Sequence, residues 1–340
     1  MSVTIYDIAK KCNCSTTTVS KVFNNHGNIS KKKKAEILKA AEELGYMKSL
    51  SAAALARNDK SNRLIGVILH INENKSITHE LFSQILNSFR TCIEQEDYDI
   101  CFMRNVSDDS PYSYSNFVRS RGMDGIFVLS ADIGNKKVSE LFESNVPIVT
   151  FDIPSSEYGV SSNNRESVTN LVDYLCKLGH KKICYVKPKD VGISEQRFEG
   201  FVDGLKKNDI KFENDMVVHG PFYKDGSAKM ITDSILNSGF NPSVIMYPDD
   251  YTAVSALSYL KSIGKKVPED ISITGFDGVE LAEFMSPNIV TIRQNTIELG
   301  RHAAELLLDL INKKEIVNKR IVVKSTLIKG HSVKEMKTEE

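Results

Sequence analysis

The 340-residue sequence contains no long apolar stretch and no apolar segment near its first residues. A helix that crosses a bilayer needs about 20 consecutive apolar residues, and a secretory signal peptide needs an apolar core behind a basic start. We therefore expect a protein that neither spans a membrane nor is exported, and that works in the reduced cytoplasm.

Residues with reactive or metal-binding chemistry are few and scattered. The sequence has no Gly-rich phosphate loop, no nucleophile elbow and no cluster with metal-ligand spacing. The six cysteines lack paired zinc spacing and mostly fall where a small buried side chain fits: Cys12, Cys14, Cys92, Cys101, Cys176 and Cys184. The sequence therefore predicts no catalytic residue, no metal and no cofactor. An enzyme remains an alternative because fold alone does not fix function.

Net charge is absent from the whole chain but not from its parts. The 44 Lys and Arg residues balance 44 Asp and Glu residues. Residues 1–60 hold 11 basic against 5 acidic residues, which leaves 33 against 39 in the remainder. A basic head on an acidic body favours a small nucleic-acid-binding module joined to a different domain. Random unevenness in a Lys-rich chain is the alternative.

Residues 15–24 (STTTVSKVFN) have the pattern of a short recognition helix. Val19, Val22 and Phe23 fall at helical spacing on one face. Ser15 can cap the helix, and Asn13 can take the left-handed conformation of a tight turn. An apolar-periodic helix over residues 5–11 precedes the turn. Together the two predict a helix-turn-helix, whose second helix enters the DNA major groove.

A third helix is predicted over residues 31–44, capped by Ser30 and ended by Gly45. Its expected apolar stripe would close a miniature core: Ile37, Leu38, Ala41 and Leu44. Residues 49–57 consist of strong helix formers but are too few for a stable isolated helix. A polar linker follows over residues 58–62.

From residue 64 the sequence alternates short apolar runs with amphipathic stretches. The predicted strands are 64–69, 99–103, 125–129, 147–151, 182–186, 216–219, 243–247 and 271–276, with closing strands at 321–323 and 326–329. The predicted helices include 81–96, 167–179, 197–208, 252–264 and 296–312. This alternation predicts α/β structure, with parallel sheets wrapped by helices. So many strands favour two lobes over one sheet.

Several strings closely resemble the lactose-repressor (LacI/GalR) family of bacterial transcription regulators. Residues 4–10 (TIYDIAK), 15–24 and 41–46 (AEELGY) are similar to that family's head. Strings similar to its regulatory core lie at residues 64–67, 123–126, 178–180, 197–201, 267–277 and 291–294. The resemblance covers about residues 3–331.

The resemblance implies an all-α helix-turn-helix head followed by a two-lobed, Rossmann-like core similar to periplasmic binding proteins. The implied bounds are a head at 1–48, a hinge helix and linker at 49–62, a core at 63–331 and a tail at 332–340. The first lobe would hold residues 63–161 and 291–321, and the second 162–290 and 322–331. A ligand would bind between the lobes, outside the carboxyl ends of the strands.

The resemblance also implies contacts to double-stranded DNA. Thr16, Thr17 and Lys21 would read bases, although Lys21 stands where the family usually has arginine and loses its rigid fork. Contacts to phosphates and orientation would come from Thr4, Tyr6, Ser15, Thr18, Ser20 and Asn24. Thr18 or Ser20 could instead satisfy only the helix backbone.

In the hinge, Ala52 and Leu55 would meet the minor groove, where an apolar wedge kinks the duplex. An ordinary apolar residue in a weak helix is the alternative for Leu55. Lys48, Ser49 and Ala53 replace the proline, asparagine and arginine of the family. The linker is also about two residues longer than the family's.

The positions that resemble the family's effector site combine carboxylates, an arginine, an amide and aromatics. Carboxylates and arginine bind hydroxyls through paired hydrogen bonds, and an aromatic ring covers the apolar face of a sugar. The residues are Phe82, Asp152, Asn164, Arg197, Phe222, Asp250 and Asp277. A structural ion pair is the alternative for Arg197 and Asp277. His70, His79 and Glu80 replace more familiar residues near the cleft entrance.

The resemblance therefore implies a DNA-binding repressor, without catalytic activity, whose affinity is controlled by a small ligand, expected to be a sugar. A homodimer would place two heads on a near-palindromic operator at the nucleoid. A sugar-binding transport component is the alternative, opposed by the helix-turn-helix and the missing export signal. The sequence leaves open whether the ligand releases the protein from DNA or helps it bind.

Overall fold

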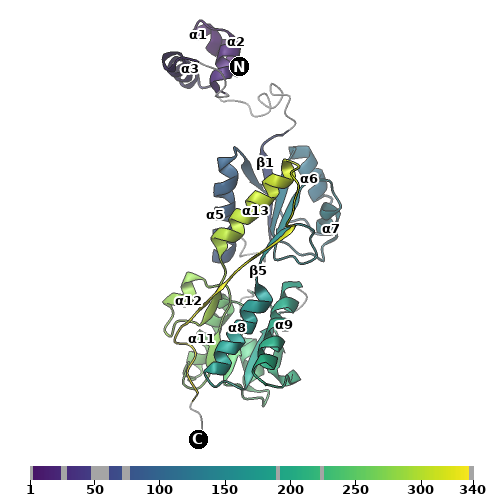
Figure 1. Cartoon of the computed structure of the whole chain (residues 1–340), viewed down its shortest axis with the longest axis vertical. Coiled ribbons are helices and arrows are strands. Elements are labelled where there is room, and N and C mark those ends of the chain that lie inside the picture. The colour runs from purple at the N-terminus through teal and green to yellow at the C-terminus, as the bar shows by residue number, and fades with distance from the viewer. Residues whose placement is uncertain are drawn as a thin grey trace. The chain divides into compact units, whose positions relative to one another are not determined.

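The structure is a computed structural model that describes residues 3–23, 29–46, 61–70, 77–188, 192–222 and 226–336. The chain divides into two compact units between Asn62 and Arg63 (Figure 1). Three predicted DNA contacts, Asn24, Ala52 and Leu55, lie outside the described residues, as does most of the expected hinge. In the described ranges, no helix is long and apolar enough to cross a membrane.

The first unit contains the three predicted helices: α1 (Ile5–Lys11), α2 (Thr16–Phe23) and α3 (Lys31–Leu44). The Ser15 hydroxyl accepts a hydrogen bond from the Thr18 backbone N–H at 3.1 Å, which confirms the predicted cap. Asn13 has φ 47°, so the turn between α1 and α2 uses the left-handed conformation expected of it. The helices bury a shared core that includes Ile8, Val19 and Ile37.

One predicted core position of α3 is wrong. Leu38 is 43% exposed, whereas Ala40 is buried at 5%. Ile37, Ala40, Ala41 and Leu44 have the i, i+3, i+4, i+7 spacing of one helix face, and Leu38 lies outside that face. The small Ala40 side chain lets α3 approach the other two helices, so the head core is built at an alanine rather than at the nearby leucine.

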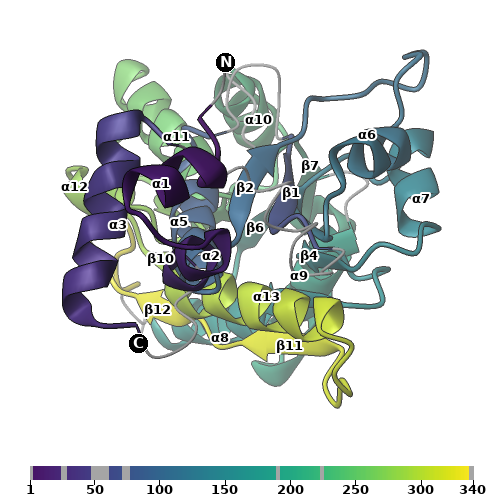
Figure 2. The same ribbon diagram turned by 90° about the horizontal axis from the view of Figure 1, so that it is seen from above.

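The first lobe of the second unit is a six-stranded parallel sheet in the order β11-β5-β4-β3-β1-β2. Its strands are β1 (Leu64–Leu69), β2 (Asp99–Phe102), β3 (Gly125–Ser130), β4 (Ile148–Phe151), β5 (Gly159–Ser162) and β11 (Arg320–Val323). Helices α5 (Glu80–Gln95) and α13 (Thr296–Ile311) cover one face. Helices α6 (Tyr114–Arg121) and α7 (Lys136–Phe142) cover the other (Figure 2).

The second lobe is a four-stranded parallel sheet in the order β7-β6-β8-β9. Its strands are β6 (Ile183–Lys187), β7 (Val217–His219), β8 (Val244–Met246) and β9 (Ser272–Thr274). Helices α8 (Asn164–Lys177) and α9 (Gly192–Lys207) pack on one face. Helices α10 (Ser227–Leu236), α11 (Asp250–Ser262) and α12 (Glu280–Phe284) pack on the other side, and η1 (Asn214–Met216) precedes β7. The predicted α/β class with a helical head is confirmed.

Three crossovers join the lobes, and hydrogen bonds connect the crossovers to one another. The chain crosses between β5 and α8, between β10 (Thr291–Arg293) and α13, and between β11 and β12 (Thr326–Ile328). Strands β10 and β12 pair antiparallel. The Ser162 hydroxyl donates to Gln294 Oε1 at 2.6 Å, and the Ser325 N–H donates to Asn163 Oδ1 at 2.8 Å. Hydrogen bonds therefore link the three crossover segments to one another.

Candidate functional site

The outward face of α2 carries the predicted base-reading side chains. Thr17 and Lys21 are exposed, and Thr16 is half-buried beside them. The apolar residues Val19 and Val22 turn the opposite face of α2 into the head core. A two-turn helix held in this way presents short hydroxyls and one long cation, which is chemistry suited to base edges in a major groove.

The predicted phosphate-contact residues divide by what their hydroxyls already bind. Tyr6 is 71% exposed on α1 and presents its ring to solvent. The Thr4 hydroxyl and backbone N–H both donate to Asp7 Oδ2, at 2.7 and 2.8 Å, and these bonds lower the pKa of Asp7. The Ser15 and Thr18 hydroxyls pair with each other at 2.9 Å. The hydroxyls of Thr4, Ser15 and Thr18 thus make hydrogen bonds within the first turns of α1 and α2, whether or not they also contact DNA.

In the core, the guanidinium of Arg197 lies at the centre of a polar cluster. Arg197 is on α9 and only 4% exposed. Its Nε donates to Asn164 Oδ1 at 2.8 Å, and its Nη1 donates to the Pro248 carbonyl at 3.2 Å. The guanidinium lies 3.6 Å from the Phe276 ring centroid and 5.7 Å from that of Phe222. Aromatic faces on a buried cation partly replace the water it has lost.

Asp152 and Asn164 extend this cluster toward the first lobe. Asn164, the first residue of α8, donates from Nδ2 to Asp152 Oδ1 at 3.2 Å and to the Ser162 carbonyl at 3.0 Å. Asp152 follows β4 with φ 52°, a left-handed conformation that Asp tolerates. Burial raises the pKa of Asp152 to about 6, while Arg197 and Asn164 act in the opposite direction. A chain of polar groups therefore joins the end of β4 to α9.

Asp250 and Asp277 form a pair of buried carboxylates. Asp250 Oδ2 accepts from the backbone N–H groups of Gly278 and Val279, at 2.7 and 2.9 Å. Burial, and next the charge of Asp277, raise the pKa of Asp250 well above its usual range. Asp277 Oδ1 accepts from Gln294 Nε2 at 2.8 Å. Asp250 thus holds the loop that presents Asp277, and Gln294 connects that loop to the crossovers.

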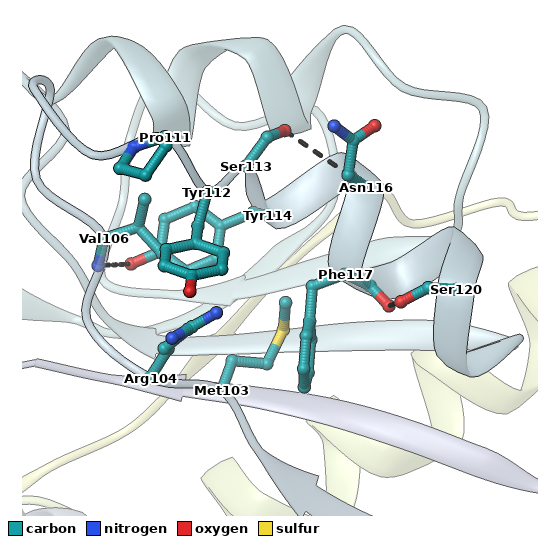
Figure 3. Close-up of a pocket in the computed structure, with 10 residues that line it drawn as sticks. All are labelled: Met103, Arg104, Val106, Pro111, Tyr112, Ser113, Tyr114, Asn116, Phe117 and Ser120. Atoms are coloured by element: carbon teal, nitrogen blue, oxygen red, sulfur yellow. Dashed lines mark hydrogen bonds between the residues drawn. The ribbon is translucent and has the colours of Figure 1, made fainter.

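Phe82 lies on α5 in the first lobe. Its ring is buried, with centroid distances of 6.2 Å to Phe151 and 5.0 Å to His79. A separate cavity of about 300 Å³ lies between the segment after β2 and α6, lined by Arg104, Tyr112 and Phe117 among others (Figure 3). None of the predicted effector residues lines that cavity.

Two family models match the chain on both sides of the hinge. The model described as bacterial regulatory proteins, lacI family, matches residues 4–49, and the periplasmic binding protein-like domain matches residues 172–333. The HTH-type transcriptional repressor PurR of Vibrio vulnificus (strain CMCP6) is 29% identical over 319 residues, which cover 92% of this chain and 93% of PurR. The chain belongs to the LacI family.

Solved structures similar to this LacI-family chain have the same fold. The lac repressor dimer bound to operator and the anti-inducer ONPF has a TM-score of 0.83 at 23% identity, covering 98% of this chain and 100% of that one. A LacI family transcriptional regulator from Enterococcus faecium with bound ribose has a TM-score of 0.69 at 25% identity, covering 81% and 100%. The two-lobed core predicted from the sequence agrees with both.

Sequence reasoning identified some members of the polar cluster of this LacI-family core and missed others. The structure brings together Asp152, Asn164, Arg197 and Phe222, and places Asp250 beside Asp277. Phe82 packs separately on α5. Three further residues were not predicted as site residues: Ser162, Phe276 and Gln294. Ser162 contacts Gln294, and Gln294 in turn contacts Asp277. Phe276 contacts Arg197. Gln294 ends the family-like string at 291–294, which was the available signal.

The raised pKa of Asp152 predicts a pH-dependent stability that Asp152→Asn removes. Because the folded-state pKa, about 6, exceeds the usual 3.8, the folded protein binds the proton more tightly and wild-type stability falls as pH rises between these values. Above pH 6 the variant should be about 1–3 kcal/mol more stable than wild type, since one pKa unit is about 1.4 kcal/mol. Below pH 4 the gain should vanish.

Urea unfolding at pH 8 and pH 4 measures this difference. Asn is isosteric with Asp and tolerates the left-handed backbone of this position. Asp99→Asn, at an exposed position of β2, controls for the loss of one carboxylate. Equal stability changes for Asp152→Asn at both pH values would contradict the prediction.

Proposed function

We propose that this chain is a sequence-specific DNA-binding transcriptional repressor, without catalytic activity, whose operator affinity is set by a small ligand bound between the core lobes. The observation that carries the proposal is that the chain has both a helix-turn-helix head and a hydrogen-bonded Arg197–Asn164–Asp152 cluster at the strand ends of a two-lobed core. The transport alternative leaves the head unexplained.

The ligand we propose is a sugar or sugar derivative. Arg197, Asn164, Asp152 and Asp277 offer the donors and acceptors that bind hydroxyls, and Phe222 offers an aromatic face. A similar LacI-family regulator from Enterococcus faecium holds ribose. Phe82 would contact the ligand from the first lobe, and Asp250 would act by supporting the Asp277 loop as well as by any direct contact.

The head would read operator DNA as part of a homodimer at the nucleoid. One α2 helix reads only one half-site, and two-fold symmetry would match a near-palindromic operator. Lys21, Thr16 and Thr17 would meet base edges, while Thr4, Tyr6, Ser15, Thr18, Ser20 and Asn24 would meet phosphates or orient the helix. Ala52 and Leu55 would act in the minor groove.

Control by the ligand would be a population shift. A ligand that binds one arrangement of the lobes more tightly than the other changes DNA affinity by that difference and no more. The crossovers between the lobes, tied by Ser162–Gln294 and Asn163–Ser325, are the elements that must adapt when the lobes move. The lobes would signal to the head through residues 49–62.

The test is a selection of random duplex DNA by the full-length protein, repeated with a panel of sugars and sugar phosphates. Enrichment of a near-palindrome whose recovery changes with one compound would support both parts of the proposal. Recovery of no specific sequence, with or without the panel, would contradict it.

Lys21→Ala is expected to weaken binding to the selected operator by about 1–3 kcal/mol and to relax preference at one base position. Lys21 is exposed on the outward face of α2, where a lysine can meet the guanine O6 and N7 acceptors. Titration against the operator and its single-base variants measures both effects.

Lys39→Ala is the matched control. Lys39 is another highly exposed lysine of the head, on α3, and its removal changes the net charge equally. A uniform loss across unrelated sequences, equal in the two variants, would show that Lys21 contributes only charge.

A further inference from the structure

The first turn of α5 in the first lobe contacts the second lobe. Glu80 is the first residue of α5 and Glu280 the first residue of α12. Glu80 Oε1 accepts a hydrogen bond from the Glu280 backbone N–H at 2.8 Å, and the same oxygen accepts from Gln84 Nε2 at 2.9 Å. Glu80 therefore binds an N–H at the start of a helix that belongs to the other lobe (Figure 1).

His79 makes a second contact in the same place. It precedes α5, is buried, and lies with its ring centroid 5.0 Å from that of Phe82 on its own helix. On the other side its ring lies 4.8 Å from that of Tyr251, the second residue of α11 in the second lobe. Two consecutive residues of the first lobe thus hold the first turns of two helices of the second.

Of those helices, α11 begins at the candidate effector residue Asp250, and α12 begins shortly after the candidate effector residue Asp277. Tyr251 follows Asp250 directly, and Glu280 follows Asp277 by three residues. Asp250 Oδ2 also holds the backbone N–H groups of Gly278 and Val279, so the loop from Asp277 to α12 has little freedom of its own. Any displacement of this loop must therefore be transmitted to the contact with Glu80.

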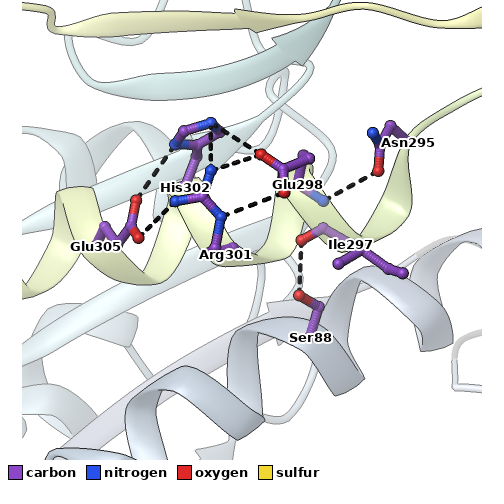
Figure 4. Close-up of polar contacts among 7 residues, drawn as sticks. All are labelled: Ser88, Asn295, Ile297, Glu298, Arg301, His302 and Glu305. Atoms are coloured by element: carbon purple, nitrogen blue, oxygen red, sulfur yellow. Dashed lines mark hydrogen bonds and ion pairs between the residues drawn. The ribbon is translucent and has the colours of Figure 1, made fainter.

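On the first-lobe side, α5 is held rigidly against α13. Thr296 Oγ1 donates to Gln84 Oε1 at 3.0 Å, one turn beyond Glu80. The Ser88 hydroxyl donates to the Ile297 carbonyl at 2.7 Å (Figure 4). At Gly300 an added Cβ would lie 2.3 Å from the Ile85 carbonyl oxygen, so the helix backbones nearly touch. The first turn of α5 therefore moves with the first lobe as a unit.

We propose that His79 and Glu80 form an interlobe clasp that holds the lobes in their closed arrangement and positions the loop 277–280. Opening the lobes breaks both contacts, whereas motions within one lobe leave them intact. The clasp thus adds to the stability of the closed arrangement alone, and only such a differential contact shifts the equilibrium between the two. A regulatory role for the clasp rests on the function proposed above. The existence of the clasp does not depend on that function.

Hydrogen exchange of the full-length protein tests the clasp directly. In Glu80→Ala, the amides at the start of α12 should exchange about ten- to hundredfold faster than in wild type, as expected for loss of one hydrogen bond to a charged acceptor. Glu80→Gln keeps a carbonyl acceptor and should restore most of the protection. Small-angle scattering should show a larger radius of gyration for Glu80→Ala.

Glu94→Ala is the matched control, because Glu94 is exposed near the other end of α5 and pairs with Arg90 at 3.7 Å within the same helix. Its exchange and radius should equal those of wild type. Unchanged exchange at the start of α12 in Glu80→Ala would overturn the proposal, as would an equal acceleration in Glu94→Ala.

A tryptophan reporter tests the His79 half of the clasp. The chain contains no tryptophan, so Tyr251→Trp would supply a single indole at the contact with His79. Adding His79→Leu to this variant should shift the indole emission as the contact changes, and adding Glu80→Ala should shift it toward that of a solvent-exposed indole. An emission spectrum unaffected by either change would overturn the interlobe contact.

Operator binding separates the clasp from the proposed function. If wild type binds its selected operator and Glu80→Ala changes that affinity at least threefold, the clasp takes part in regulation. If exchange responds but affinity does not, the regulatory role fails while the repressor function stands. If wild type binds no specific DNA, the repressor function fails, and the exchange result still decides whether the clasp exists.

Discussion

Gly200→Ala is expected to destabilise the core by about 1–3 kcal/mol, the usual cost of overpacking a filled interior. Gly200 lies on α9 where it crosses α8, and an added Cβ would lie 2.2 Å from the Arg165 carbonyl oxygen. That oxygen belongs to backbone and cannot rotate away, so α9 must move. Arg197 lies about one helical turn before Gly200, and Asn164 is the residue before Arg165. The displacement of α9 would therefore separate Arg197 from Asn164 and disturb the polar cluster.

Urea unfolding of the full-length protein measures the loss, and ligand binding measures the damage to the cluster. Gly134→Ala is the control, because its added Cβ would meet only the Asp132 side-chain oxygen at 3.2 Å, in an exposed turn. That variant should stay within about 0.5 kcal/mol of wild type. A Gly200→Ala variant as stable as Gly134→Ala would refute the close approach of α8 and α9.

Arg197→Met is expected to raise the ligand concentration needed for a response by about tenfold or more, while leaving operator binding by the head intact. The change removes the donors to Asn164 and to the Pro248 carbonyl but keeps an apolar side chain against Phe276. A hydrogen bond from a charged group contributes about 1.5–3 kcal/mol. Loss of one bond to a ligand should therefore weaken ligand binding by about tenfold or more.

Arg165→Met provides the comparison on the same pair of helices. Arg165 bridges α8 to Glu199 and Asp203 of α9 at 2.8 and 2.6 Å, but its side chain is 55% exposed. Exposed ion pairs contribute about 0–1 kcal/mol, so this variant should keep its ligand response. Operator titrations with and without the ligand identified by selection measure both variants. An Arg197→Met protein that responds at the same ligand concentration as wild type would exclude Arg197 from the ligand site.

The head was predictable because its signals are local. The 3.6-residue period, Ser15 and Ser30 as caps, and Gly45 after the last turn all act within a few residues of one another. Leu38 shows the limit of such reasoning. A leucine next to the apolar stripe looks buried in sequence, but the choice between Leu38 and Ala40 depends on how closely α3 meets α1 and α2.

Elements fixed by distant partners were harder to predict. Strand β5 (Gly159–Ser162) was not predicted because it contains two serines and only one β-branched residue. It is a strand because β4 and β11 pair with it on its two sides, and β11 comes from residues more than 150 positions later. No local pattern contains that information.

The candidate site shows the same division between local and distant information. A carboxylate after a strand can bind a ligand or a backbone N–H, and the sequence does not separate the two. Asp250 binds the N–H groups of Gly278 and Val279, 28 and 29 residues away. Gln294 and Ser162 meet across 132 residues. Direct ligand contact by Asp250 and by the other predicted effector residues stays a prediction.

The place of β11 in the first sheet constrains how the chain can be synthesised. β11 pairs in parallel with β5 and closes that edge of the sheet. While residues 320–323 are still inside the ribosome, β5 has one side open, and unpaired strand edges invite association with other chains. By then all four strands of the second sheet, β6 to β9, have been translated. The sheet that begins first is therefore completed last, so a nascent chain stalled late in synthesis would expose an incomplete first sheet beside a second sheet whose strands are all present.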